Sequence, residues 1–164
     1  MLNFLTRFGL SAALLLLAYL PANGQNSKRH INGIMPVDVY LNMEGRGFLT
    51  KKNLLGAEEG NLWINEKNQA GIDYRVETYS HSPNDIENIR ATAMVDPVAK
   101  KIVATVPFFE YVASLPYDKS EPQKAAAWIR NNINKNKATT LIGGVRFTIM
   151  VPSKWYRMLI MEAE

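Results

Sequence analysis

The sequence predicts an α+β domain: an antiparallel sheet of about five to six strands covered on one side by two or three helices. Three observations lead to this prediction. Short segments of alternating apolar and polar residues dominate the first half of the chain, helical patterns fall in the middle, and two strand-like segments joined by a short turn close it. This order of elements is typical of an antiparallel sheet packed against helices.

Residues 1–24 have the pattern of a secretory signal peptide. Arg7 supplies the positive charge, residues 8–20 form an apolar run, and Ala22-Asn23-Gly24 places small residues before an expected cleavage at Gln25. The run is shorter than the roughly 20 residues of a membrane-spanning helix, although an uncleaved N-terminal anchor is the rival reading. We expect a bacterial protein, periplasmic or secreted, with no stable membrane insertion after cleavage.

After the signal, residues 25–35 read as a polar, flexible lead-in outside the core, and residues 36–164 as a single domain. The chain has no cysteine, which excludes disulfides, thiol catalysis and thiolate metal sites. Its net charge of +4 is too small to indicate a nucleic-acid surface. Packing of large apolar side chains must therefore stabilise the fold.

The first predicted strand covers Val37–Met43, where apolar and polar residues alternate. Gly45-Arg46-Gly47 follows and is read as a plain turn. The alternative is that glycine-flanked backbone amides approach an anion there. Residues 48–60 show no clear pattern.

A hairpin is predicted next. Leu62–Ile64 is a short strand candidate, Asn65–Gly71 supplies turn residues, and Ile72–Thr78 shows the cleanest alternation in the chain. In the second strand the apolar face points inward and the other face is charged.

Ser82–Asp85 resembles a helix start, with a capping serine and a proline at the first position. We expect one helical turn there, followed by a strand over Asn88–Val95. A further strand up to Val106 and a helix over Phe108–Leu115 are then favoured over one helix kinked at Pro107.

Ser120–Gln123 has the pattern of a capping box, and the helix that it opens is expected to run to about Asn134. A loop follows, and two strands over residues 144–151 and 155–162 finish the domain. Met158–Met161 is apolar on both faces, which indicates a central or covered strand.

The two histidines of the chain, His30 and His81, are too few for a three-histidine metal site. His81 is close in sequence to Ser82 and Asp85, but neighbours in one short turn rarely form a catalytic triad. We expect these residues to hydrogen-bond a turn.

Glu58-Glu59 and Asp118 could contribute to a carboxylate pair for glycoside cleavage, but solvated surface acids are the simpler reading. The sequence has no nucleotide-binding or nucleophile motif. It therefore predicts no catalytic residue, no metal ligand and no cofactor.

Four residues are predicted to contact a ligand or partner: Tyr79, Tyr117, Trp155 and Arg157. Tyr79 falls on the charged face of its strand, and Tyr117 follows a proline in a loop. Trp155 lies beside Lys154 and Arg157 at a hairpin tip. Exposed aromatic side chains of this kind form contact surfaces for sugars and proteins.

We expect an exported, non-enzymatic binding module for an unidentified protein or cell-envelope component. One alternative is a carrier of a small apolar ligand, held between sheet and helices by a flexible lining of methionines: Met43, Met94, Met150, Met158 and Met161. A hydrolase would need His81 or two acids to converge in a cleft. A structural subunit of the envelope is the fourth possibility.

Overall fold

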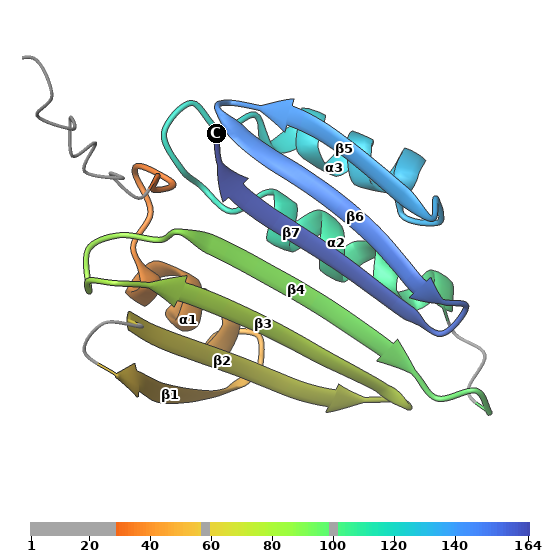
Figure 1. The fold of residues 1–164 in the computed structure, drawn as a ribbon. Helices are drawn as coiled ribbons and strands as arrows, with labels where there is room; N and C mark the ends of the chain where they lie inside the picture. The colour runs from red at the N-terminus through yellow and green to blue at the C-terminus, as the bar shows by residue number, and fades with distance from the viewer. Residues whose placement is uncertain (1–28, 57–59, 99–101) are drawn as a thin grey trace, which may run out of the picture.

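The computed structural model describes residues 29–56, 60–98 and 102–164. These residues form one antiparallel sheet with the strand order β1-β2-β3-β4-β7-β6-β5. The three α-helices within the described ranges lie on one face of the sheet (Figure 1). The α+β class is therefore confirmed, with seven strands rather than five to six.

The strands are β1 (Leu49–Gly56), β2 (Gly60–Gln69), β3 (Ile72–Ser80), β4 (Asn88–Val95), β5 (Lys137–Ile142), β6 (Val145–Ser153) and β7 (Tyr156–Ala163). The helices are α1 (Pro36–Glu44), the short 3₁₀ helix η1 (Ile102–Thr105), α2 (Val106–Ala113) and α3 (Pro122–Asn132).

The predicted strand over Val37–Met43 is wrong, because this segment lies in α1. Asp38 in the first turn accepts a 2.8 Å hydrogen bond from the backbone amide of Met35. Val39 and Met43 are four residues apart and both fully buried, as expected for one face of a helix. Apolar and polar residues do alternate in this segment, but its first-turn hydrogen bond and its buried face are those of a helix.

The predicted hairpin of β2 and β3 is confirmed, with a shorter turn. β2 continues to Gln69, and only Ala70 and Gly71, both with positive φ (54° and 76°), connect the strands. Residues 48–60 also contain an unpredicted strand, since β1 pairs with β2 along the edge of the sheet.

The pattern of residues 86–95 fits a helical stripe through Ile86, Ile89, Ala93 and Met94 as well as a strand, and the strand that we favour over Asn88–Val95 is confirmed as β4. The helix start at Ser82–Asp85 is wrong: these residues form a turn in which the Ser82 hydroxyl lies 2.6 Å from Asp85 Oδ2. The strand up to Val106 is also wrong for its described part, because residues 102–105 form η1.

Helices α2 and α3 confirm the two helices expected in the middle of the chain. The capping box is wrong, since Glu121 is the N-cap residue of α3 and no side chain caps that helix end. The loop expected after α3 is confirmed only for residues 133–136. Residues 137–142 form β5, an edge strand whose side chains are mostly half-buried or exposed.

The closing hairpin of β6 and β7 is confirmed. β7 lies between β6 and β4 in the sheet, which agrees with its apolar character on both faces. The two-residue connection of β5 to β6 is Gly143-Gly144, and both glycines have positive φ (58° and 80°).

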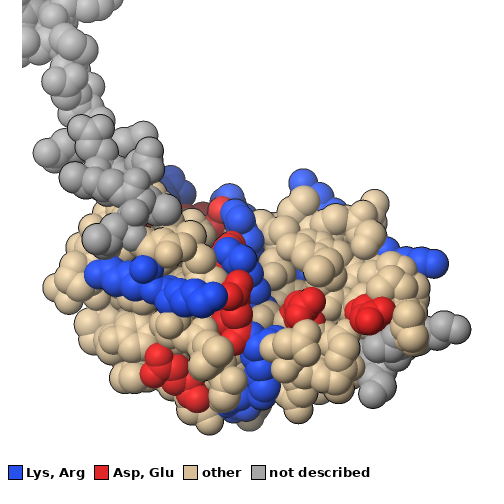
Figure 2. All heavy atoms as spheres, turned by 90° about the horizontal axis from the view of Figure 1, so that it is seen from below, with Lys and Arg blue, Asp and Glu red and all other residues tan. Residues whose placement is uncertain are grey.

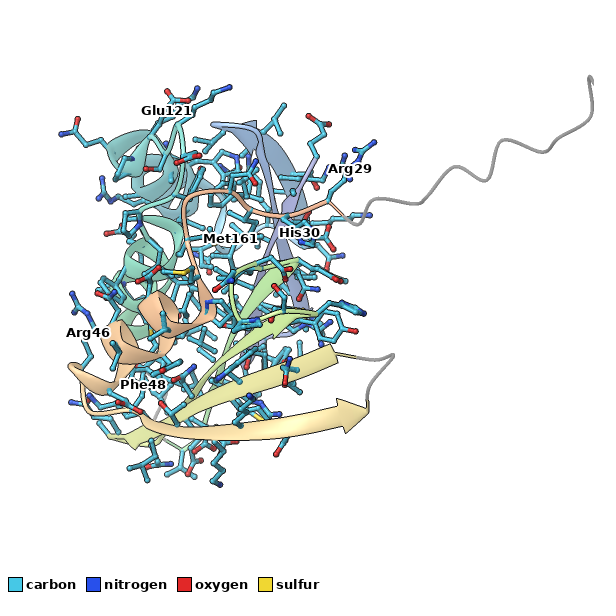
Figure 3. All side chains as sticks on the ribbon, turned by 90° about the vertical axis from the view of Figure 1, so that its left-hand side faces the viewer. Arg29, His30, Arg46, Phe48, Glu121 and Met161 are labelled. Carbon is cyan, nitrogen blue, oxygen red and sulfur yellow. The ribbon has the colours of Figure 1, made fainter. Side chains whose placement is uncertain are left out.

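The core fills the space between the helices and one face of the sheet, and Met161 of β7 points into it (Figure 3). Ile31 and Ile34 also belong to it, with 2% and 3% exposure. The amide of Ile31 donates a 2.7 Å hydrogen bond to the carbonyl of Ile86. Ile31 and Ile34, which were expected outside the core, are thus part of it, whereas Asn32 and Gly33 between them are exposed.

The other face of the sheet, called the open face here, carries a row of ion pairs across four strands. Lys51 pairs with Glu66 (3.2 Å), Glu66 with Arg75 (3.2 Å), Arg75 with Glu77 (2.7 Å) and Glu77 with Arg90 (3.4 Å). The charges of the open face therefore largely compensate one another. The view from below looks onto the β1 edge of the molecule, where acidic and basic side chains also lie interspersed (Figure 2).

Within the described ranges, no helix combines the length and the apolar character that a membrane span requires.

Candidate functional site: a cationic aromatic pocket

A pocket of about 230 Å³ lies where the end of α1, the β2–β3 hairpin and the start of α2 meet. We call it the aromatic pocket. Its main lining residues are four aromatic side chains and two cations: Phe48, Tyr74, Phe108, Tyr111, Arg46 and Lys67. Gln69, Ala104 and Pro107 complete the wall.

The end of α1 places Arg46 at the pocket. The amides of Gly45, Arg46 and Gly47 donate hydrogen bonds to helix carbonyls at 3.0, 2.9 and 2.8 Å, and Gly47 has the positive φ (79°) that ends a helix at glycine. These amides are therefore engaged, and the alternative reading in which they bind an anion is not supported. The turn instead places both Arg46 and Phe48 at the wall of the pocket, on the α1 side of the molecule (Figure 3).

The Arg46 guanidinium lies over the ring of Tyr111, with 3.4 Å from its central carbon to the ring centroid. This is a cation–π contact. The Tyr111 hydroxyl donates a 3.1 Å hydrogen bond to Asn42 of α1, which fixes the ring under the guanidinium. A guanidinium packed on a ring face keeps its N–H groups available at its edge.

The second cation, Lys67 on β2, donates a 2.8 Å hydrogen bond to the carbonyl oxygen of Arg46. Its ammonium nitrogen lies 5.8 Å from the ring centroid of Phe48. Among the described residues, no carboxylate lies within ion-pair distance of Arg46 or Lys67. The pocket thus has a local positive charge that the described part of the protein does not neutralise.

The aromatic rings form a packed floor. Phe108 lies 6.0 Å from Phe48 and 4.8 Å from Tyr74 between ring centroids, and it also contacts the fully buried Phe109 at 5.0 Å. Burial raises the pKa of the Tyr74 hydroxyl, so the ring is neutral at physiological pH. The floor is therefore closely packed and largely apolar, with Lys67 above Phe48 and Arg46 above the neighbouring Tyr111 ring.

The structure does not bring the four predicted contact residues together. In the sheet, Tyr79 is the register partner of Asn88, which in turn pairs with Glu162 near the end of β7. Trp155 lies at the other end, directly before β7 begins. The two side chains are thus separated by about the length of a strand, roughly 25 Å. Each is partly exposed: Tyr79 packs edge-on against His81, and the Lys154 ammonium lies 4.8 Å from the Trp155 ring centroid.

Tyr117 and Arg157 are buried, with 6% exposure each. The Tyr117 hydroxyl donates to the carbonyl of Ile142. Arg157 donates to the carbonyls of Ser153, Lys154 and Tyr156 and to the amide oxygen of Asn134. Both side chains are engaged inside the protein and do not form a contact surface.

The polar residues near His81 pair with one another. His81 Nδ1 contacts the Glu87 carboxylate, and His30 Nδ1 lies 3.7 Å from Asp85 Oδ1. The Ser82 hydroxyl bonds to Asp85 rather than to a histidine, so this turn lacks the serine–histidine bond of a triad. Glu58 and Glu59 lie outside the described residues, and Asp118 is exposed.

The methionines proposed to line a ligand cavity lie on opposite faces of the sheet. Met43 and Met161 are packed in the core. Met94 and Met150 are 52% and 37% exposed, and their strand positions put them, with Met158, on the open face. They do not share one interior space.

A second hollow, of about 720 Å³, lies mainly over the open face. Lys67 lines this hollow as well. Its other charged groups have partners within the protein: Arg75 pairs with Glu66, and Asp73 accepts a hydrogen bond from the side-chain amide of Asn68. The smaller aromatic pocket is therefore the stronger candidate, because its two cations have no acidic partner in the described structure.

From the sequence, Arg46 is predicted only as part of a turn, and no functional role is predicted for Lys67 or Phe108. These residues come from three segments far apart in the chain, and the pattern around Lys67 only indicates a turn. No protein-family model, curated protein or solved structure matches the chain, so its function is argued from this site alone.

Proposed function

We propose that the chain is an exported, non-enzymatic binding domain that recognises a protein or cell-envelope component through the aromatic pocket. The observation that carries the proposal is the pair of cations, Arg46 and Lys67, held over an aromatic floor without an acidic partner in the described residues. The signal-peptide pattern of residues 1–24, which lie outside the described structure, supports export.

Contact sites of this composition are common in binding proteins. Arginine and aromatic side chains are enriched at interfaces and at the few positions that supply most of the binding energy. Here Tyr111 and the Arg46 backbone fix the two cations in place before binding. Such preorganisation reduces the entropy lost when a partner binds.

The hydrolase hypothesis has less support. The histidines and the serine that it needs are engaged with Asp85 and Glu87 in and beside one turn. The carrier of an apolar ligand also has less support, because its methionines lie on opposite faces of the sheet. Pockets for drug-sized ligands usually exceed about 300 Å³, whereas this one has about 230 Å³.

The test is affinity purification from the native envelope fraction, with mass spectrometry of bound proteins and small molecules. The bait is the full-length chain with a C-terminal tag, either unchanged or with the double substitution R46A/K67M. K154M is the matched control, because Lys154 is also a cation beside an aromatic ring, at the β6–β7 turn.

We expect a stoichiometric partner with the unchanged chain and with K154M, and a loss of that partner with R46A/K67M. Equal recovery with all three baits would show that binding does not use the pocket and would overturn the proposal.

A further inference from the structure

We infer that the aromatic pocket recognises a single ring that carries a carboxylate. The ring would lie on Phe48, Tyr74 and Phe108, and the carboxylate would lie between the Arg46 guanidinium and the Lys67 ammonium. This inference rests on the proposed function, because it names the chemistry that the same pocket would bind.

The size of the pocket limits the part of a ligand that it can hold to about one ring. A protein cavity of about 150 Å³ is enough to hold benzene, and the aromatic pocket has about 230 Å³. The difference leaves room inside the pocket for a short substituent such as a carboxymethyl group. A ring on a floor of rings gains the offset or edge-to-face contacts that aromatic pairs prefer.

The charges select an anion. Lys67 has three N–H donors and gives one to the Arg46 carbonyl. The Arg46 guanidinium donates to no acceptor among the described residues and lies against Tyr111. Both cations line the pocket. A planar carboxylate accepts charge-assisted hydrogen bonds from guanidinium and ammonium groups, whereas a cationic ligand would be repelled.

The walls favour an apolar ring over a sugar. Apart from Gln69 and the tyrosine hydroxyls, the lining side chains without charge are hydrocarbon: Phe48, Phe108, Ala104 and Pro107. The Tyr111 hydroxyl is already bonded to Asn42. A sugar ring would bring several hydroxyls, and a hydroxyl buried without a partner is costly.

A free aromatic acid and a polypeptide that ends in phenylalanine present the same chemistry, so the test has an arm for each source. The probes are 3-phenylpropionate, its uncharged amide, propionate, and a short peptide ending in Phe with either a free or an amidated C-terminus. Binding to the full-length protein is followed by calorimetry and by chemical-shift changes in the pocket residues.

We expect 3-phenylpropionate to bind saturably. Its amide, which lacks the charge, and propionate, which lacks the ring, should each bind at least about tenfold more weakly, because each loses one of the two kinds of contact. R46A/K67M should lose the preference for the acid, and K154M should keep it. If the peptide acid also binds, the ligand is a chain end; if only the free acid binds, it is a small molecule.

Equal binding of acid and amide, or no binding of either acid, would overturn the inference. The proposed function would still stand in that case if a partner from the envelope fraction were lost with R46A/K67M. Conversely, acid binding at the pocket without any pocket-dependent partner in the purification would support the inference and reject a protein or envelope partner.

Discussion

The hydroxyl of Tyr117 donates a 2.8 Å hydrogen bond to the carbonyl oxygen of Ile142. This bond ties the loop between α2 and α3 to the end of the edge strand β5. Both residues are buried, so neither group can turn to water when its partner is removed.

Tyr117→Phe should lower the free energy of unfolding by about 1–2 kcal/mol, because it removes the bond and leaves the Ile142 carbonyl without a partner. Urea unfolding at pH 7 measures the change. Ligand binding at the aromatic pocket should not change, since Tyr117 does not line it. A neutral effect on stability would show that water replaces the hydroxyl.

The same residue predicts a loss of stability at high pH. Burial, with a smaller contribution from Glu121, raises the pKa of Tyr117 to about 12, above the unfolded value of about 10. The folded state therefore keeps a proton that the unfolded state loses, and this contribution is present below pH 10 and is lost as the pH rises to about 12. The unfolding free energy of Tyr117→Phe should decline less over that interval than that of the unchanged protein.

Arg157→Lys should destabilise the protein by about 2 kcal/mol, because an ammonium cannot reproduce the forked donors of a buried guanidinium. The lost contacts include those to the Ser153 carbonyl and the Asn134 side chain. Arg130→Lys is the matched control: Arg130 pairs with Glu110 at the surface, so its replacement should change stability by less than about 0.5 kcal/mol. Similar effects for both variants would contradict a structural role of Arg157.

The paired glycines of the β5–β6 turn predict unequal costs for the same substitution. Both have positive φ, which costs a residue with a Cβ about 1 kcal/mol. A Cβ on Gly143 would also lie 2.2 Å from the Lys119 carbonyl oxygen, whereas one on Gly144 would meet nothing within 4 Å. Gly143→Ala should thus cost roughly 2 kcal/mol more than Gly144→Ala, measured by thermal or urea unfolding. Equal costs would mean that the Lys119 loop moves freely away from the turn.

The sequence predicts an element well where hydrophobic pattern and local turn signals agree. In β3 one face is largely buried and the other is polar, which is the pattern that alternation detects. In α1 the same pattern fits two structures: Val39 and Met43 are buried, but Leu41 is 56% exposed. Alternation alone could not reveal that Leu41 faces away from the core.

The edge strand β5 and the aromatic pocket could not be predicted from the sequence, for different reasons. In β5 only Ile142 is fully buried, so its polar residues resemble a loop. The pocket depends on packing between segments: Arg46 follows a helix, Lys67 is on a strand, and Phe108 is on another helix. Tyr117 was predicted to lie exposed at a contact surface. The structure buries it, because a loop position after a proline does not reveal whether the ring packs inward.

We expect the Asp85 carboxylate, in the turn before β4, to make a pH-dependent contribution to stability that depends on its hydrogen bonds from Ser82. Burial alone would raise the pKa of Asp85, but hydrogen bonds from the Ser82 hydroxyl and amide, together with His30 and the His81 amide, outweigh it and lower the pKa. A lowered pKa stabilises the folded state above the unfolded value of about 3.9, and this stabilisation is lost as the pH falls below it.

Ser82→Ala should therefore cost about 1 kcal/mol at pH 7 and progressively less at pH 3 and below, as Asp85 becomes protonated in both states. Urea unfolding at the two pH values measures the difference. The control is Ser114→Ala, because the Ser114 hydroxyl donates a 2.7 Å bond to the Glu110 backbone carbonyl, which does not titrate. Its cost should be the same at both pH values. A cost of Ser82→Ala that stays constant down to pH 3 would show that the Ser82 hydroxyl does not act through the Asp85 carboxylate.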